Sequence, residues 1–162
     1  MKNLIAIVLP ILLVGCVAKS GLKPIVYDDH LIGTWTRTIH MPDESWFEEI
    51  TYSKDGRKCS YSISFYPSGK TSVSFYESRW KINGQNIEAE VVKSTSKYVP
   101  VGQRFTDKIE SLLDGKLIIQ MTRPFIGDEK EIFYKSQYER NGKICVLVQR
   151  HIDVTNIELR GR

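Results

Sequence analysis

The sequence has few histidines and no apolar run long enough to cross a membrane as a helix. Its longest apolar stretch runs only from Leu4 to Val14, whereas a spanning helix needs about 20 apolar residues. The three histidines share no metal-ligand spacing with one another or with a cysteine: His30, His40 and His151. We therefore expect neither a membrane-spanning helix nor a metal site.

The sequence also lacks the usual patterns of catalysis and of nucleic-acid binding. It has no G-x-S-x-G nucleophile motif. The run Ser68–Thr71 ends like a phosphate-binding loop, but Ser64 stands where the motif needs glycine and a strand pattern follows, so we expect a hairpin turn. The basic residues are scattered and form no stripe, which argues against nucleic acid as a partner. We expect a protein that is not an enzyme and has no cofactor.

Acidic residues occur in three pairs: Glu48 with Glu49, Glu88 with Glu90, and Glu129 with Glu131. Paired carboxylates can perform acid–base catalysis. The last two pairs have strand spacing, and Glu88 and Glu90 alternate with apolar neighbours that take the opposite face. We therefore interpret the pairs as solvated strand faces.

The first sixteen residues carry a targeting signal. Lys2 precedes the apolar stretch, which ends in the run Leu13-Val14-Gly15-Cys16. This order is typical of a secretory signal peptide, here residues 1–15. Leu13–Cys16 resembles the lipobox of bacterial lipoproteins, which implies cleavage before Cys16 and fatty acylation, such as palmitate, of that residue. An ordinary secreted protein with a chance cysteine is the alternative.

In enteric-type lipoproteins an aspartate after the acylated cysteine favours the inner membrane. Val17 stands there, so the resemblance implies the outer membrane, facing the periplasm. Residues 16–29 have little apolar pattern and would serve as the lipidated tether. The formal net charge of the whole chain is +4; such a mildly basic surface tolerates anionic lipid headgroups.

Two cysteines remain after Cys16, namely Cys59 and Cys145. An even number in an oxidising compartment suggests a disulfide. Two buried free thiols are the alternative.

Turn signals at regular intervals predict a chain of β-hairpins: Asp55-Gly56, Ser68-Gly69, Asn83-Gly84, Pro100–Gly102, Asp114-Gly115, Gly127-Asp128 and Asn141-Gly142. Apolar and polar residues alternate strictly from Cys59 to Phe65, the pattern of a half-buried strand. Ile144–Val148 is a continuous apolar run that we expect to be a buried strand. Thr106–Leu113 has the spacing of a helix.

We therefore predict an all-β, antiparallel up-and-down meander of about 8–10 strands, which avoids exposed edges by closing into a barrel. Gly33-Thr34-Trp35 is similar to the G-x-W signature of lipocalins and other calycin barrels. The resemblance covers about residues 31–136. It implies that Trp35 plugs the closed end of the barrel and that Thr106–Leu113 is a strand. Arg140 or Arg150 would be the late arginine that packs over this tryptophan.

The expected domain is a lipocalin-like barrel over residues 30–150, followed by residues 151–162 as a last strand, a short helix or a tail. We expect a small apolar or amphipathic ligand inside it, in contact with aromatic side chains that the alternation places inward: Trp35, Tyr61, Phe65, Phe75 and Trp80. The alternative is a barrel filled by side chains that binds an envelope protein, as an inhibitor or as an assembly or secretion component.

Overall fold

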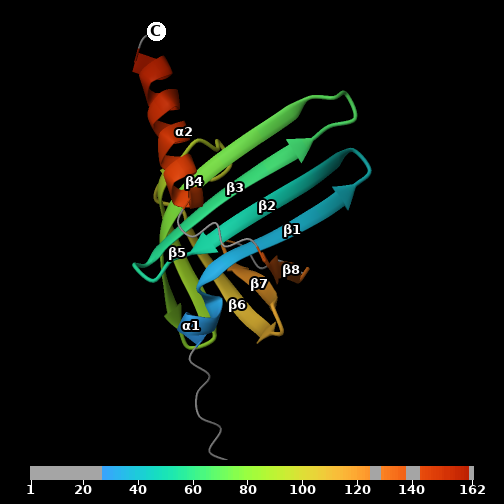
Figure 1. Ribbon diagram of the computed structural model, residues 1–162, viewed down its shortest axis with the longest axis vertical. Coiled ribbons are helices and arrows are strands. Elements are labelled where there is room, and N and C mark those ends of the chain that lie inside the picture. Colours follow the sequence, from blue (N-terminus) through green and yellow to red (C-terminus); the bar gives the residue numbers. More distant parts are fainter. Residues whose placement is uncertain (1–26, 125–128, 138–142, 161–162) are drawn as a thin grey trace, which may run out of the picture.

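The computed structural model describes residues 27–124, 129–137 and 143–160. A short helix, α1 (Tyr27–Leu31), leads into eight strands, and a long helix follows them (Figure 1). The strands are β1 (Gly33–Met41), β2 (Glu44–Tyr52), β3 (Arg57–Phe65), β4 (Thr71–Asn83), β5 (Asn86–Ser94), β6 (Arg104–Leu113), β7 (Lys116–Arg123) and β8 (Glu131–Lys135). The last helix is α2 (Lys143–Arg160). The predicted signal peptide, Cys16 and most of the tether lie outside the described residues.

Consecutive strands pair antiparallel, and β8 pairs back onto β1, so the sheet is a closed barrel. The predicted all-β meander that closes into a barrel is thus confirmed. Asp114 and Gly115 both take positive φ angles, 50° and 73°, as a tight hairpin with the twist of its strands requires. The turn signals Gly127-Asp128 and Asn141-Gly142 lie outside the described residues. Thr106–Leu113 is part of β6, the strand that the lipocalin resemblance implied.

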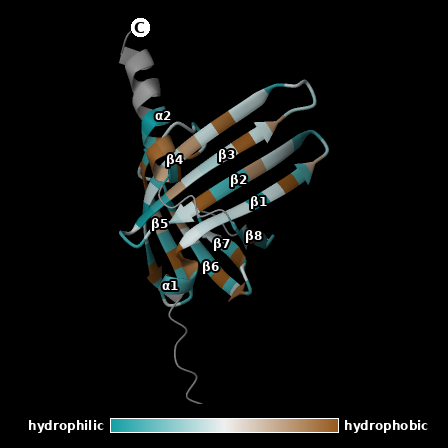
Figure 2. Cartoon of the chain, viewed as in Figure 1, coloured by the Kyte–Doolittle hydropathy of each residue, from teal (hydrophilic) through white to brown (hydrophobic). Residues whose placement is uncertain are grey.

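An apolar core fills the end of the barrel that α1 covers. The indole Nε1 of Trp35 donates a hydrogen bond to the Leu31 carbonyl oxygen, 2.8 Å away, and this bond ties α1 to the barrel floor. Inward residues of six further strands pack around them: Ile50, Tyr52, Ile87, Ile109, Leu117, Ile119 and Phe133, with Trp80 and Ile82 at the edge. Figure 2 shows this gathering of apolar colour around α1, β5 and β6.

Among the described residues, a lysine and not Arg150 is the basic residue over Trp35. Lys135 Nζ lies 5.5 Å from the centroid of the Trp35 ring. Arg150 lies on α2, beside hollows outside the barrel, and Arg140 lies outside the described residues. Gly33, with a φ of 127°, passes so close to this lysine that a Cβ atom there would lie 3.3 Å from Lys135 Cε. The positive φ angle, which L side chains rarely adopt, is therefore the main reason for glycine at this position.

The strand predicted at Ile144–Val148 is wrong, because these residues begin α2. Ile144, Cys145 and Val148 are buried against the outer face of β3 and β4, whereas Val146 and Leu147 are exposed. This is helical spacing of a buried stripe. A short apolar run fits a strand or a buried helix equally well, so periodicity alone could not separate them. The helix also continues through residue 150, where we had ended the barrel domain.

The predicted disulfide is present between Cys59 of β3 and Cys145 of α2, with an S–S distance of 2.06 Å. Figure 1 shows α2 lying across β3 and β4 on the outside of the barrel. Among the described residues, neither helix combines the length and the apolar character that crossing a membrane would require.

Replacing both cysteines, Cys59→Ala with Cys145→Ala, should lower the free energy of unfolding by about 4 kcal/mol, because the bond closes a loop of 86 residues in the unfolded chain. Urea unfolding of residues 17–162 measures this loss, and adding a reductant to the parent protein should reproduce it. A change within about 0.5 kcal/mol of the parent, the usual range for a surface substitution, would contradict a stabilising bond.

Candidate functional site

A cavity of about 520 Å³ lies inside the barrel, above the apolar floor. Ile50 and Ile119 belong both to the floor and to the cavity wall. Around the cavity stand side chains of β1, β2, β3, β4, β6, β7 and β8 and of the segment between β5 and β6. The volume falls within the range of pockets that bind small molecules.

Two clusters of charged side chains lie in this cavity, and Arg37 is at the centre of the first. Its guanidinium donates to Glu48 Oε2 from Nε at 2.8 Å and from Nη2 at 2.7 Å, and Nη1 lies 3.0 Å from Glu131 Oε2. The same guanidinium lies 4.9 Å from the ring centroid of Trp46 and 4.7 Å from that of Phe133. The two carboxylates and the two rings fix Arg37 in one position.

Tyr76 extends this group towards β4, because its hydroxyl donates to Glu48 Oε1 at 3.3 Å. Both oxygens of Glu48 therefore accept hydrogen bonds. Such full engagement satisfies the hydrogen-bonding capacity of a buried side chain.

The second charged group joins β3 to β6. Lys58 Nζ lies 4.0 Å from Asp107 Oδ2 and 5.5 Å from the centroid of the Tyr52 ring. Burial raises the pKa of Asp107, and the nearby Lys58 opposes this rise. Burial likewise raises the pKa of Glu131, against the lowering effect of Arg37. The pKa values of both carboxyl groups therefore depend on the charged groups next to them.

Above the charged groups, the wall of the cavity is rich in hydroxyl groups. Alternate residues of β3 and β4 and one residue of the segment between β5 and β6 contribute serines: Ser62, Ser64, Ser72, Ser74 and Ser96. Tyr66 and Tyr98 line the same cavity and are exposed, and Met41 and Met121 add flexible apolar surface. The wall can therefore contact both polar and apolar parts of one molecule.

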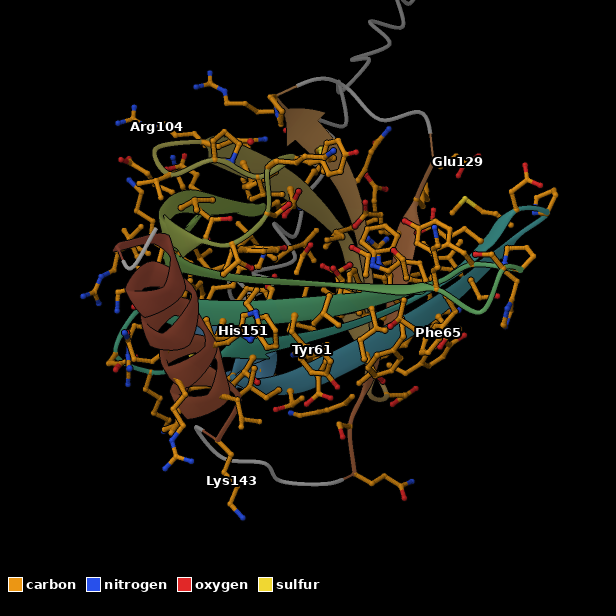
Figure 3. The ribbon with its side chains drawn as sticks, turned by 90° about the horizontal axis from the view of Figure 1, so that it is seen from above. Tyr61, Phe65, Arg104, Glu129, Lys143 and His151 are labelled. Atoms are coloured by element: carbon orange, nitrogen blue, oxygen red, sulfur yellow. A yellow bond between two sulfur atoms is a disulfide. The ribbon has the colours of Figure 1, made fainter. Side chains whose placement is uncertain are left out.

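The structure separates the five aromatic residues that we expected around a ligand. Trp35 and Trp80 belong to the floor; Trp80 packs edge-on against Tyr52, with ring centroids 5.1 Å apart. Tyr61 and Phe75 lie on the outside, where their rings stack at 5.9 Å beneath α2. Figure 3 shows Tyr61, Phe65 and His151 on the side of the sheet where α2 lies.

The inward orientation expected for Tyr61, Phe65 and Phe75 is therefore wrong. The alternation in β3 is real, but its serine face points inward and its apolar face points outward, because α2 and the disulfide cover that outer face. Tyr61 and Phe75 line an outer groove of about 420 Å³ with Ile63, Val73, Leu147, Arg150 and His151. Contact between any of these aromatic residues and a ligand remains a prediction.

Sequence reasoning missed the charged residues of the cavity. Glu48 interrupts an inward apolar face of β2, and this interruption was the available signal. Glu131 enters the cavity rather than a solvated face, because it begins β8 opposite Arg37. Glu88 and Glu90 do face outward, where they pair with Lys81 and Arg104. Lys58, which follows a turn rich in charge, is buried.

No protein-family model matches the chain, and no curated protein matches it. Two solved structures are similar to it. One is a lipocalin-like protein from Bacteroides uniformis ATCC 8492, with 18% identity over 66% of this chain and 99% of that chain and a TM-score of 0.42. The other is an uncharacterized protein from Bacteroides eggerthii DSM 20697, with 18% identity over 65% of this chain and 99% of that chain and a TM-score of 0.40.

The strand pairing of this chain itself defines the class of protein. Eight antiparallel strands in meander order close into one barrel, and the tryptophan of the G-x-W segment lies in the floor of that barrel under the short helix α1. These features make the domain a lipocalin-like barrel, a type of fold that can hold one small molecule.

Replacing Arg37 with methionine should lower the free energy of unfolding by about 3–5 kcal/mol at neutral pH, because Glu48 and Glu131 would lose their shared cation. Without Arg37 the pKa of Glu131 rises further, so the folded variant prefers the protonated carboxyl. The loss of unfolding free energy relative to the parent protein should therefore be small in acid and should grow as the pH rises through that pKa. Urea unfolding from pH 4 to pH 8 measures this.

The triple variant Arg37→Met, Glu48→Gln, Glu131→Gln is the matched control, and it should recover most of the stability because it removes the unpaired charges. A deficit that is independent of pH, or that persists in the triple variant, would show that Arg37 acts through packing alone.

Proposed function

We propose that this protein binds one small amphipathic molecule inside its barrel. One observation carries this proposal: the cavity of about 520 Å³ joins an apolar floor to a layer of buried ion pairs. A barrel that served only as a packed scaffold would fill this space with side chains. The open space, together with a few convergent polar groups, is the usual form of a ligand site.

The lining favours an amphipathic molecule over a wholly apolar one. Glu131 and the serines of β3 and β4 offer polar contacts, and an apolar molecule placed against them would remove their water without replacing it. The side chains of Met41, Val99 and Met121 offer apolar contacts in the same cavity. A ligand with one polar end and one apolar end satisfies both sets.

We further propose that the protein binds and does not catalyse. Both oxygens of Glu48 already accept hydrogen bonds from Arg37 and Tyr76. Arg37 also holds Glu131, and Asp107 lies beside Lys58. Three acidic groups engaged in this way are suited to positioning a ligand and to fixing charge within the barrel.

The proposed location is the periplasmic face of a bacterial outer membrane, with Cys16 acylated and the barrel tethered through residues 16–29. The support is the lipobox-like run before Cys16 and the valine that follows it. Several acyl chains together hold a protein stably at a bilayer. A binding barrel in that place would meet amphipathic molecules that pass between membrane and periplasm.

A contact with an envelope protein is the second candidate function, and the outer groove favours it. Leu147 of α2 and Val73 of β4 are exposed there, and exposed apolar residues that lie together are typical of contact surfaces.

Residues 17–162, exported to the periplasm, should carry an adduct of a few hundred daltons in native mass spectrometry. Ser62→Trp should lower its occupancy roughly tenfold, because the indole enters the cavity and displaces the ligand at a cost of at least about 1.4 kcal/mol. Thr38→Trp is the matched control on an exposed position of β1, and it should leave the occupancy unchanged. An adduct-free parent protein would favour the second candidate.

In cells fed an alkyne-tagged fatty acid, the full chain should become labelled and should fractionate with the outer membrane. Cys16→Ala should abolish both, because no other cysteine stands at the lipobox-like position. A Cys59→Ala, Cys145→Ala variant controls for labelling at the remaining thiols. Labelled protein in the inner-membrane fraction would contradict the role given to Val17, and label on Cys16→Ala would contradict acylation of Cys16.

A further inference from the structure

The charge of the cavity is opposite in sign to the charge of the chain. Two cationic side chains, Arg37 and Lys58, line it together with four carboxylates: Glu44, Glu48, Asp107 and Glu131. When all are ionised the lining is negative by two charges, whereas the whole chain has a formal net charge of +4. Because the barrel wall has a low dielectric constant, it focuses the electric field of these charges on a molecule bound in the cavity.

Neither cation is accessible to a ligand. The side chain of Arg37 is only 9% exposed, and its guanidinium is held between two rings and two carboxylates. The side chain of Lys58 is 6% exposed and lies between Asp107 and the Tyr52 ring. An anionic ligand would have to displace a carboxylate from one of these cations before it could bind.

Two of the four carboxylates, in contrast, are within reach, namely Glu131 and Glu44. The side chain of Glu131 is 25% exposed, the most of the five residues in the Arg37 and Lys58 ion pairs. Glu44 is half-buried and lines the same cavity from the start of β2, where the β1–β2 hairpin turns. The charge that a bound molecule meets is therefore negative.

We propose that the ligand is an amphipathic cation whose ammonium group lies beside the Glu131 carboxylate. This inference rests on the proposed binding function and names the chemistry of its ligand. A cation supplies positive charge that offsets the excess of carboxylates, and it relieves the repulsion of Glu131 by Glu48 and Asp107. Burial first, and then this repulsion, raise the pKa of Glu131. Tyr66 adds an aromatic face, which attracts cations. The apolar part of the ligand lies against Met41, Met121 and Val99.

Three probes with the same tail and different heads test this: dodecyltrimethylammonium, dodecyl maltoside and dodecanoate, each titrated into residues 17–162 below its micelle concentration. Isothermal calorimetry should show that the cation binds at least about tenfold more tightly than the neutral probe, a difference of about 1.4 kcal/mol, and that dodecanoate binds most weakly. Adsorption to the net basic surface would give the opposite order, so surface binding cannot imitate the expected result.

Glu131→Gln should weaken binding of the cation roughly tenfold and leave dodecyl maltoside unchanged. Glu129→Gln is the matched control, because Glu129 is exposed before β8 and is absent from the cavity lining (Figure 3). If Glu131→Gln does not fold, Glu44→Gln, at the half-buried position in β2, should show a smaller loss confined to the cation.

Equal binding of all three probes, or a loss for Glu131→Gln that is the same for the neutral probe, overturns the cationic ligand but leaves the binding function standing. If no probe binds and native protein carries no adduct, both proposals fail together.

Discussion

The barrel depends on a short seam, and the ion pair of Arg37 with Glu131 holds that seam on the inside. β1 and β8 share only two paired positions, Trp35 with Lys135 and Thr36 with Tyr134. A two-residue ladder is a weak closure, because each hydrogen bond adds only about 1 kcal/mol net. Arg37 lies just past the ladder on β1 and joins Glu131 of β8 to Glu48 of β2. One guanidinium therefore links three strands where the backbone pairing ends.

Within the ladder itself, Lys135 lies over Trp35, whose indole holds α1 against the floor. The seam thus has one cation within the ladder and a second just past it, and each cation lies over at least one aromatic ring. The charged groups are part of the closure as well as of the cavity, which explains why they can stay buried. An ion pair that also joins strands recovers some of the cost of its desolvation through the hydrogen bonds it satisfies.

The sequence predicted the strands better than it predicted their faces. Hairpin glycines and alternation were enough to predict a closed meander, because turn chemistry and period 2 are local properties. Alternation does not say which face is inside. Ile87, Ala89 and Val91 do point into the core, yet the equally regular apolar face of β3 points outward. What decides β3 is α2, a distant segment whose helical stripe of Ile144, Cys145 and Val148 covers that face.

The same cause explains the polar cavity. β3 and the first half of β4 place Cys59, Tyr61 and Phe75 on the outside, against α2, and the disulfide secures that contact. Their inner faces above the floor therefore do not have to form an apolar core, and serines can occupy those positions. A lipocalin-like barrel without such an outer layer needs apolar side chains within in order to stay folded. Here two separate apolar clusters, one below and one outside, leave the middle of the barrel open for charge and for a ligand.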